Sequence, residues 1–201
     1  MKLLRNLIFI AISAVTVLAT VSFAQQFSAT ETAERGVEAL LKTVQESKDY
    51  FLSDRERYFS AIEGVLDSFV DFDAVVEVVM NRYADAASEA QKQRFAVILR
   101  STLTRFYGAS LISYDGEELA FLPTADPNSD SRADTIVGME LRGSDNNLRL
   151  QYQMFINEND EWKLKNVSLA GINLGRQYFT QFSALMSQHD QNIDLVLDNW
   201  Q

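Results

Sequence analysis

The chain of 201 residues contains no cysteine, a single histidine and only two prolines. Without cysteine it can form neither a disulfide nor a thiolate metal site, so packing has to stabilise the fold. One histidine without cysteine also disfavours a zinc site. The hydrolase, P-loop and dinucleotide motifs G-x-S-x-G, G-x-x-x-x-G-K-[ST] and G-x-G-x-x-G do not occur. We therefore expect no cofactor and no metal.

Positive charge is scarce as well. The sequence has 18 Lys and Arg residues against 28 Asp and Glu residues, and its formal net charge is −10. A chain of this charge is repelled by the phosphates of nucleic acids and by anionic membrane surfaces. We expect no nucleic-acid partner, although solubility alone is a sufficient reason for an acidic composition.

The N-terminus has the three parts of a secretory signal peptide. Lys2 and Arg5 precede an apolar run over residues 7–21, and small residues lead to Ala24. We expect cleavage after Ala24, which leaves residues 25–201 as a single domain and removes two cations, so that the formal charge becomes −12. A transmembrane anchor is the alternative, but the apolar run is close to the minimum length for a span. An exported chain without disulfides fits the bacterial periplasm.

Residues 25 to about 114 are expected to be helical. Three capping boxes predict where helices begin, and each precedes an apolar pattern with a period of 3.6 residues: Ser28-x-x-Glu31, Ser53-x-x-Glu56 and Ser88-x-x-Gln91. A shorter helix is predicted from about Asp71 to Met80. Two more are predicted after the strands, from Leu174 to about Gln188 and from Asp190 to Trp200.

Residues 117–170 change to an alternating pattern that is typical of strands. Four strands are predicted: Glu117–Leu122, Asp134–Arg142, Leu148–Ile156 and Trp162–Ala170. The pattern leaves the facing of the fourth strand ambiguous. Glu140 has the opposite parity to Met139 and is expected to face outward, paired with an arginine of a neighbouring strand. The sequence thus predicts an α+β domain, a four-stranded antiparallel sheet whose apolar face is covered by helices.

The acidic and basic candidates for catalysis have simpler explanations. His189 lies beside Asp190 between two predicted helices, where a solvated imidazole is favoured by the helix dipole. The pair Glu117 and Glu118 fits a charged sheet edge. Asp71, together with Asp73, fits the start of a helix. We therefore expect no catalytic residue.

Aromatic residues make up 11% of the chain. Many fall where the helices should meet the apolar sheet face, as Phe69, Tyr107, Tyr152 and Phe182 do. Two interpretations remain open, a packed aromatic core and an apolar cavity, because periodicity alone does not distinguish them.

Three segments, in this order and spacing, resemble the MlaC family of periplasmic phospholipid-binding proteins, also known as the toluene-tolerance group. The first is Phe69–Met80, followed by the turn Arg82-Tyr83-Ala84. The second is Ser88-x-x-Gln91-x-x-Arg94-Phe95. The third runs from Trp162 through Gly171-Ile172-Asn173-Leu174 to Gln177-Tyr178-Phe179.

This resemblance implies a curved sheet packed against helices, in a cone like that of nuclear transport factor two, with acyl chains between sheet and helices. It implies phospholipid as ligand, and as partners an inner-membrane ABC transporter complex with an MCE-domain protein and an outer-membrane lipoprotein–porin complex. The residues expected to contact lipid are Phe69, Phe72, Val76, Val79, Phe106, Tyr107, Val137, Met139, Leu141, Leu150, Tyr152, Met154, Ile172, Leu174 and Tyr178. A cavity enzyme of the isomerase or dehydratase type, or a lipid-free periplasmic adaptor, are the alternatives.

Overall fold

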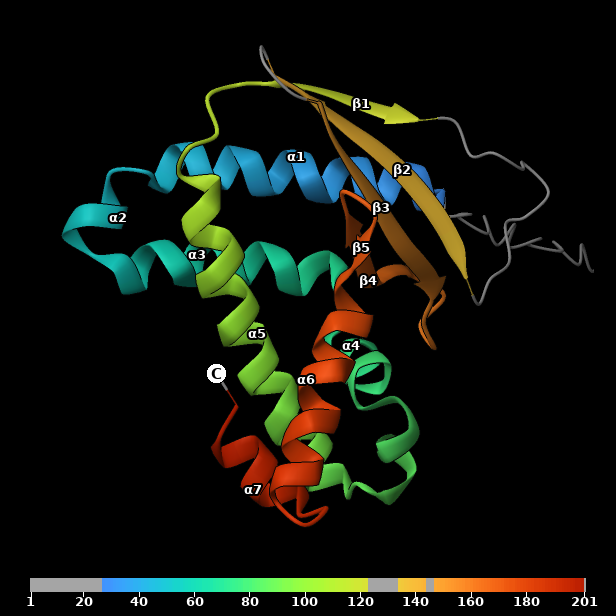
Figure 1. Ribbon diagram of the computed structural model, residues 1–201. Helices are drawn as coiled ribbons and strands as arrows, with labels where there is room; N and C mark the ends of the chain where they lie inside the picture. The colour runs from blue at the N-terminus through green and yellow to red at the C-terminus, as the bar shows by residue number, and fades with distance from the viewer. Residues whose placement is uncertain (1–26, 123–133, 144–146, 201) are drawn as a thin grey trace, which may run out of the picture.

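The computed structural model describes residues 27–122, 134–143 and 147–200. The expected signal peptide lies outside these residues. Helices come first, then a sheet, then helices again (Figure 1). The helices are α1 (Ala29–Ser47), α2 (Tyr50–Ser53), α3 (Arg55–Phe69), α4 (Phe72–Met80), the 3₁₀ helix η1 (Asn81–Ala86), α5 (Glu89–Leu111), α6 (Leu174–Gln188) and α7 (Ile193–Asp198). The strands are β1 (Glu118–Leu122), β2 (Thr135–Arg142), β3 (Asn147–Ile156), β4 (Trp162–Leu169) and β5 (Ile172–Asn173).

Two of the three predicted capping boxes are confirmed. The hydroxyls of Ser28 and Ser88 accept hydrogen bonds from the N–H groups three residues later, and the side chains there bond back to the caps. The capping box predicted at Ser53 is wrong. Ser53 ends α2, and Asp54 begins α3 by accepting a hydrogen bond from the Arg57 N–H at 3.2 Å. Asp54 takes over because its backbone is not helical and its carboxylate is a good N-cap acceptor.

The sheet is an antiparallel meander in the order β1-β2-β3-β4-β5. The four predicted strands are present, and the two-residue strand β5 extends the sheet beyond them. The outward pairing predicted for Glu140 is confirmed. Its carboxylate accepts hydrogen bonds from Arg149, its cross-strand partner, at 3.0 Å and from Arg142 at 3.1 Å.

A β-bulge in β4 explains why the facing of this strand is ambiguous in the sequence. Met154 of β3 pairs with Leu164, but the preceding Gln153 pairs with Asn166. Lys165 is therefore an extra residue, and the alternation of side chains shifts by one position after it. Leu164 and Val167 consequently both line the inner side of the sheet.

The helices cover one face of the sheet (Figure 1). The sheet arches over α1, α3 runs alongside α1, and α4, α5, α6 and α7 gather below them. The buried apolar residues form three clusters: one among α4 to α7, one between α1 and the sheet, and one where α1 and α3 meet. Within the described residues, none of the helices has the length and apolar character needed to span a membrane.

Candidate functional site: an apolar cavity under the sheet

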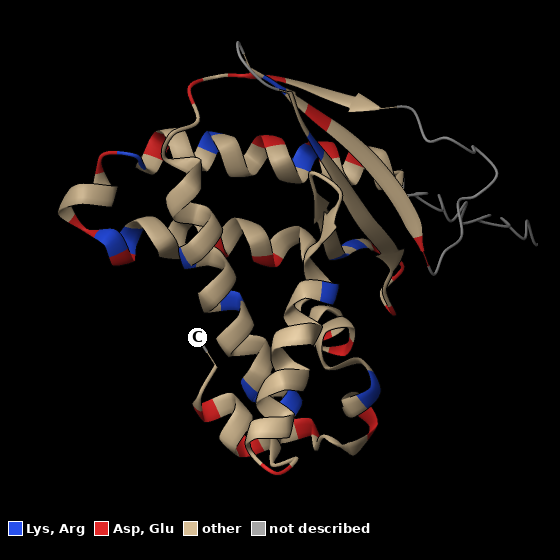
Figure 2. Cartoon of the chain, viewed as in Figure 1, with Lys and Arg blue, Asp and Glu red and all other residues tan. Residues whose placement is uncertain are grey.

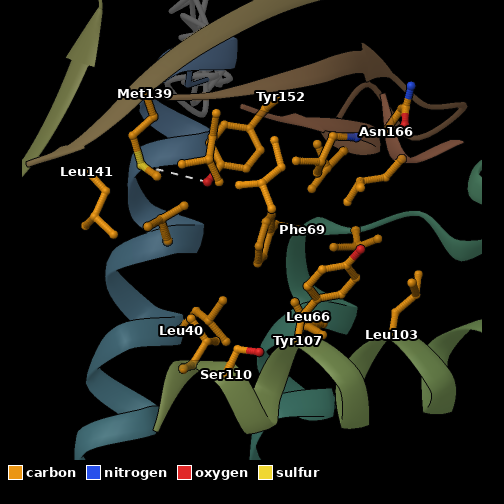
Figure 3. Close-up of a pocket in the computed structure, with 18 of the residues that line it drawn as sticks. Leu40, Leu66, Phe69, Leu103, Tyr107, Ser110, Met139, Leu141, Tyr152 and Asn166 are labelled. Atoms are coloured by element: carbon orange, nitrogen blue, oxygen red, sulfur yellow. Dashed lines mark hydrogen bonds between the residues drawn. The ribbon is translucent and has the colours of Figure 1, made fainter. Parts of the chain in front are cut away.

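A cavity of about 480 Å³ lies between the sheet and the helices (Figure 3). This volume is within the roughly 300–1,000 Å³ that is usual for small-molecule sites. Its walls are almost entirely apolar. The inward-facing residues are therefore not all part of a packed core. The sequence left a packed core and an apolar cavity open, and the structure contains a cavity.

The sheet forms the roof of the cavity. Met139 of β2 is opposite Leu150 of β3, which is opposite Leu169 of β4, so these three side chains form one row on the inner face. Leu141 and Leu148 form a second, parallel pair. All five residues line the cavity. The period of two residues along each strand thus produces a continuous apolar ceiling.

Five helices form the floor and walls. They contribute Val37, Leu40 and Leu41 of α1, Leu66 and Phe69 of α3, Phe72, Val75 and Val79 of α4, Leu103, Tyr107, Ser110 and Leu111 of α5, and Leu174, Gly175 and Tyr178 of α6. In Figure 3 Phe69 and Tyr107 project toward the middle of the space, with Leu40 on one side and Leu103 on the other. Each helix presents side chains spaced three or four residues apart, which is how one face of a helix meets a cavity.

The exposed part of the lining consists of a few residues. Among the described lining residues, only Ser110, Ser113 and Leu148 are exposed to solvent. They lie at the end of α5, just beyond it, and near the start of β3. Other residues of the lining, such as Val79 and Gly175, are buried. We define the mouth of the cavity by Ser110, Ser113 and Leu148.

Tyrosine hydroxyls supply much of the polar character of the lining. Tyr114 donates a hydrogen bond to the Glu117 carbonyl at 3.1 Å. Burial, together with the hydrogen bond to the hydroxyl of Tyr107, raises the pKa of Tyr178 well above its usual range. Burial likewise raises the pKa of Tyr152. These phenols therefore stay neutral at physiological pH and do not act as bases.

Asn166 fixes the junction between the sheet and α6. Its Oδ1 accepts hydrogen bonds from the Val167 and Gly175 N–H groups, both at 2.9 Å, and its Nδ2 donates to Asn173 at 3.0 Å. Asn173 in turn caps α6 by accepting from the Arg176 N–H. The bulge at Lys165 turns Asn166 into this position, which is a usual role of β-bulges.

Ten of the fifteen residues expected to contact lipid line the cavity: Phe69, Phe72, Val79, Tyr107, Met139, Leu141, Leu150, Tyr152, Leu174 and Tyr178. The other five lie elsewhere. Val76, Val137 and Met154 are buried in the packed clusters beside it. Phe106 and Ile172 are 65% and 59% exposed.

The sequence prediction missed the contribution of α1 and part of that of α5. Val37, Leu40 and Leu41, with Leu103 and Leu111, line the cavity although none was among the expected residues. Their helical periodicity was visible, but it indicates a buried face without saying what that face contacts.

Of the groups considered for catalysis, Glu117 lines the cavity, whereas His189, Asp71, Asp73 and Glu118 do not. His189 ends α6, where its N–H donates to the Leu185 carbonyl at 3.0 Å. Asp71 caps α4 by accepting from the Ala74 N–H, as its position in the sequence indicated. Among the described residues, no group of histidines, cysteines and carboxylates is arranged to hold a metal ion.

Fold and cavity together define an α+β protein in which an antiparallel meander and helices enclose an apolar binding space. Residues 34–201 match the MlaC protein family, so the chain belongs to that family. It is 28% identical over 163 residues to the toluene tolerance protein Ttg2D of Pseudomonas putida, an alignment that covers 80% of this chain and 74% of that protein.

A solved structure has the same fold. It is that of a phospholipid-binding protein from Ralstonia solanacearum in complex with a phospholipid, with a TM-score of 0.77 and 20% sequence identity. The match covers 86% of this chain and 94% of that one. The family and the fold class expected from the sequence are thereby confirmed.

Proposed function

We propose that this protein is a periplasmic phospholipid carrier, not an enzyme. It holds acyl chains in the cavity and shuttles lipid between outer-membrane and inner-membrane complexes, which maintains the lipid asymmetry of the outer membrane. The observation that carries the proposal is the apolar cavity of about 480 Å³ between the sheet and the helices. Membership of the MlaC family and the phospholipid bound to the Ralstonia solanacearum protein support it.

The physics of lipid transfer explains why such a carrier is needed. Each CH₂ group moved from water to an apolar site gains about 0.8 kcal/mol. Sixteen such groups amount to roughly 13 kcal/mol per acyl chain, so a free lipid crosses an aqueous compartment very slowly. A carrier with an apolar cavity lowers this barrier, and it needs no nucleophile, metal or nucleotide to do so.

Charge favours delivery through protein partners over direct adsorption to membranes. Acidic and basic residues are interspersed along the helices and strands in the view of Figure 2. With a formal charge of −10 for the full sequence, anionic bilayers repel the protein. The expected partners are an inner-membrane ABC transporter complex with an MCE-domain protein and an outer-membrane lipoprotein–porin complex.

The alternative of a cavity enzyme requires an acid or base inside the apolar space. Among the described lining residues the one carboxylate is that of Glu117, close in sequence to Ser113 at the mouth. Its own backbone N–H and that of Asp115 hold the pKa of this carboxyl below its usual range. Glu117 therefore has no proton to donate at neutral pH, and the lowered pKa also makes its carboxylate a weaker general base. This observation weighs for the carrier.

The experiment is to purify the mature protein from cells, extract it with organic solvent and quantify phospholipid per mole of protein. The carrier predicts phospholipid in a fixed, near-stoichiometric ratio. A lipid-free adaptor predicts none, and a cavity enzyme predicts a small-molecule substrate or product instead. Absence of phospholipid from a well-folded preparation, and failure of the delipidated protein to take it up from vesicles, would rule out the carrier.

A further inference from the structure

Tyr152 places a hydroxyl group beneath the apolar ceiling of the cavity. The residue comes from the middle of β3 and is only 7% exposed. Its hydroxyl donates to the Met139 sulfur at a distance of 3.8 Å, as the dashed line in Figure 3 shows. A thioether sulfur is a weak acceptor, so the donor is only partly satisfied. A buried, under-satisfied donor carries a free-energy cost that phenylalanine would avoid.

Other tyrosines of this protein have stronger partners. Tyr58, buried away from the cavity, donates to the Gly108 carbonyl at 2.8 Å, and Tyr114 donates to the Glu117 carbonyl at 3.1 Å. The hydroxyls of Tyr107 and Tyr178 bond to each other. Among the described tyrosines that line the cavity, Tyr152 alone is recorded with sulfur as its acceptor. Its raised pKa keeps it a neutral donor.

The depth of this hydroxyl suits one part of a lipid. Leu148, at the mouth, precedes Tyr152 by four residues on β3, a distance of about 14 Å along the strand. The Tyr152 side chain leans toward Met139. Met139 is opposite Leu150, and Leu150 follows Leu148 by two residues, so Met139 is only about 7 Å along the strand from the level of Leu148. In a diacyl phospholipid the ester carbonyls lie directly below the head group. A lipid whose head group stays at the mouth therefore brings its carbonyls to this level.

We propose that the Tyr152 hydroxyl donates a hydrogen bond to an acyl ester carbonyl of the bound lipid. The carbonyl oxygen is a stronger acceptor than the Met139 sulfur, so lipid binding completes the hydrogen bonding of the phenol. The cavity then selects ester-linked lipids over ether-linked ones, which have the same chains but lack the carbonyl. This proposal rests on the proposed function, since it assumes a phospholipid in the cavity.

The test compares two probes with the delipidated mature protein. One is a diester phospholipid, and the other is the diether analogue with the same head group and chain length. The wild-type protein should bind the diester roughly two- to tenfold more tightly, the range expected for one net hydrogen bond. Tyr152→Phe should lose this preference by weakening diester binding while leaving diether binding unchanged. Tyr58→Phe, which removes a hydroxyl outside the cavity, is the matched control and should keep the preference.

A second measurement does not depend on the variant folding. In the wild-type complex the infrared band of the ester carbonyl should shift to lower wavenumber than for the same lipid in an apolar solvent, as hydrogen bonding requires. Equal binding of diester and diether by the wild type, or an equal preference in Tyr152→Phe, would overturn the proposal while leaving the carrier function intact. If neither probe binds the wild type, the carrier function itself is wrong.

Discussion

The side chain of Asn166 in β4 accepts a hydrogen bond from the backbone N–H of Gly175 in α6, with an oxygen–nitrogen distance of 2.9 Å. This bond joins the end of the sheet to the first turn of α6, and both residues line the cavity. The approach is possible because Gly175 has no side chain. A Cβ atom there would lie 2.5 Å from Val78 Cγ1 and 2.8 Å from Asn166 Oδ1.

Gly175→Ala should therefore lower the free energy of unfolding by about 1–3 kcal/mol, the usual cost of overpacking. Urea unfolding of the delipidated protein measures it. The matched control is Gly64→Ala in α3, where a Cβ meets nothing within 4 Å. That change should stabilise the protein by about 0.5–1 kcal/mol, since alanine is the better helix former. Equal effects of the two substitutions would show that the junction is looser than described.

Leu150 and Val137 show the difference between the cavity lining and the packed core. Both lie on the inner face of the sheet, but Leu150 lines the cavity whereas Val137 is 1% exposed within the cluster between α1 and the sheet. Leu150→Trp should keep the stability of the delipidated protein and expel bound lipid, because the ring fills the space of an acyl chain. Val137→Trp should overpack and cost about 1–3 kcal/mol or more.

Melting of the delipidated variants and phospholipid content after purification test this pair together. If Leu150→Trp retains the full amount of lipid, the acyl chains do not occupy this part of the cavity. If Val137→Trp is as stable as the wild type, the core beside the cavity is not packed as described.

The outer face of the sheet makes a prediction about pH. Hydrogen bonds from Arg149 and Arg142 hold the pKa of Glu140 below the ordinary value of 4.5. A carboxyl whose pKa is lower in the folded state stabilises the fold above its unfolded pKa, and this contribution is lost as the pH falls through the folded value. In Glu140→Gln the free energy of unfolding should therefore fall less steeply than in the wild type as the pH is lowered below 4.5.

Urea unfolding at a series of pH values measures this slope. Arg149→Met should reduce this pH dependence by less than Glu140→Gln does, because Arg142 still contacts the carboxylate. A variant Glu140→Gln with the same pH dependence as the wild type would show that this ion pair contributes nothing to acid stability.

Transfer to membranes without partners should be slow. The acidic protein is repelled by anionic vesicles, so little fluorescent lipid should move from the loaded carrier to them at low ionic strength, and raising the salt concentration should speed the transfer by screening the charge. Zwitterionic vesicles are the control and should depend little on salt. Rapid transfer to anionic vesicles at low salt would contradict the need for protein partners.

Much of the architecture could be predicted from local patterns, since capping at Ser28 and Ser88 and the alternation of β2 and β3 depend on neighbours in sequence. The prediction failed where two acceptable caps stand side by side, at Ser53 and Asp54. It was ambiguous at Lys165, because the extra residue of a bulge is defined only by the partner strand. The bulge belongs to tertiary structure, which a pattern within one segment does not record, whereas the cap depends on the local backbone at Asp54.

The cavity was harder to predict than the fold. Val137 and Met139 share one strand, one face and similar polarity, yet only Met139 lines the cavity. The difference depends on how closely α1 and the other helices approach each point of the sheet. Phe106 and Ile172 were expected to contact lipid because they are large and apolar, but they are exposed instead. Hydrophobicity alone did not reveal the direction in which they point.

Photocrosslinking with a phospholipid that carries a photoreactive group within its acyl chain tests the central claim most directly. The delipidated protein is loaded with this lipid, irradiated and digested, and the modified residues are located by mass spectrometry. The account predicts adducts on cavity residues such as Leu66, Tyr107 and Leu150. Adducts confined to exposed apolar residues such as Phe106 and Ile172, with none in the cavity, would contradict it.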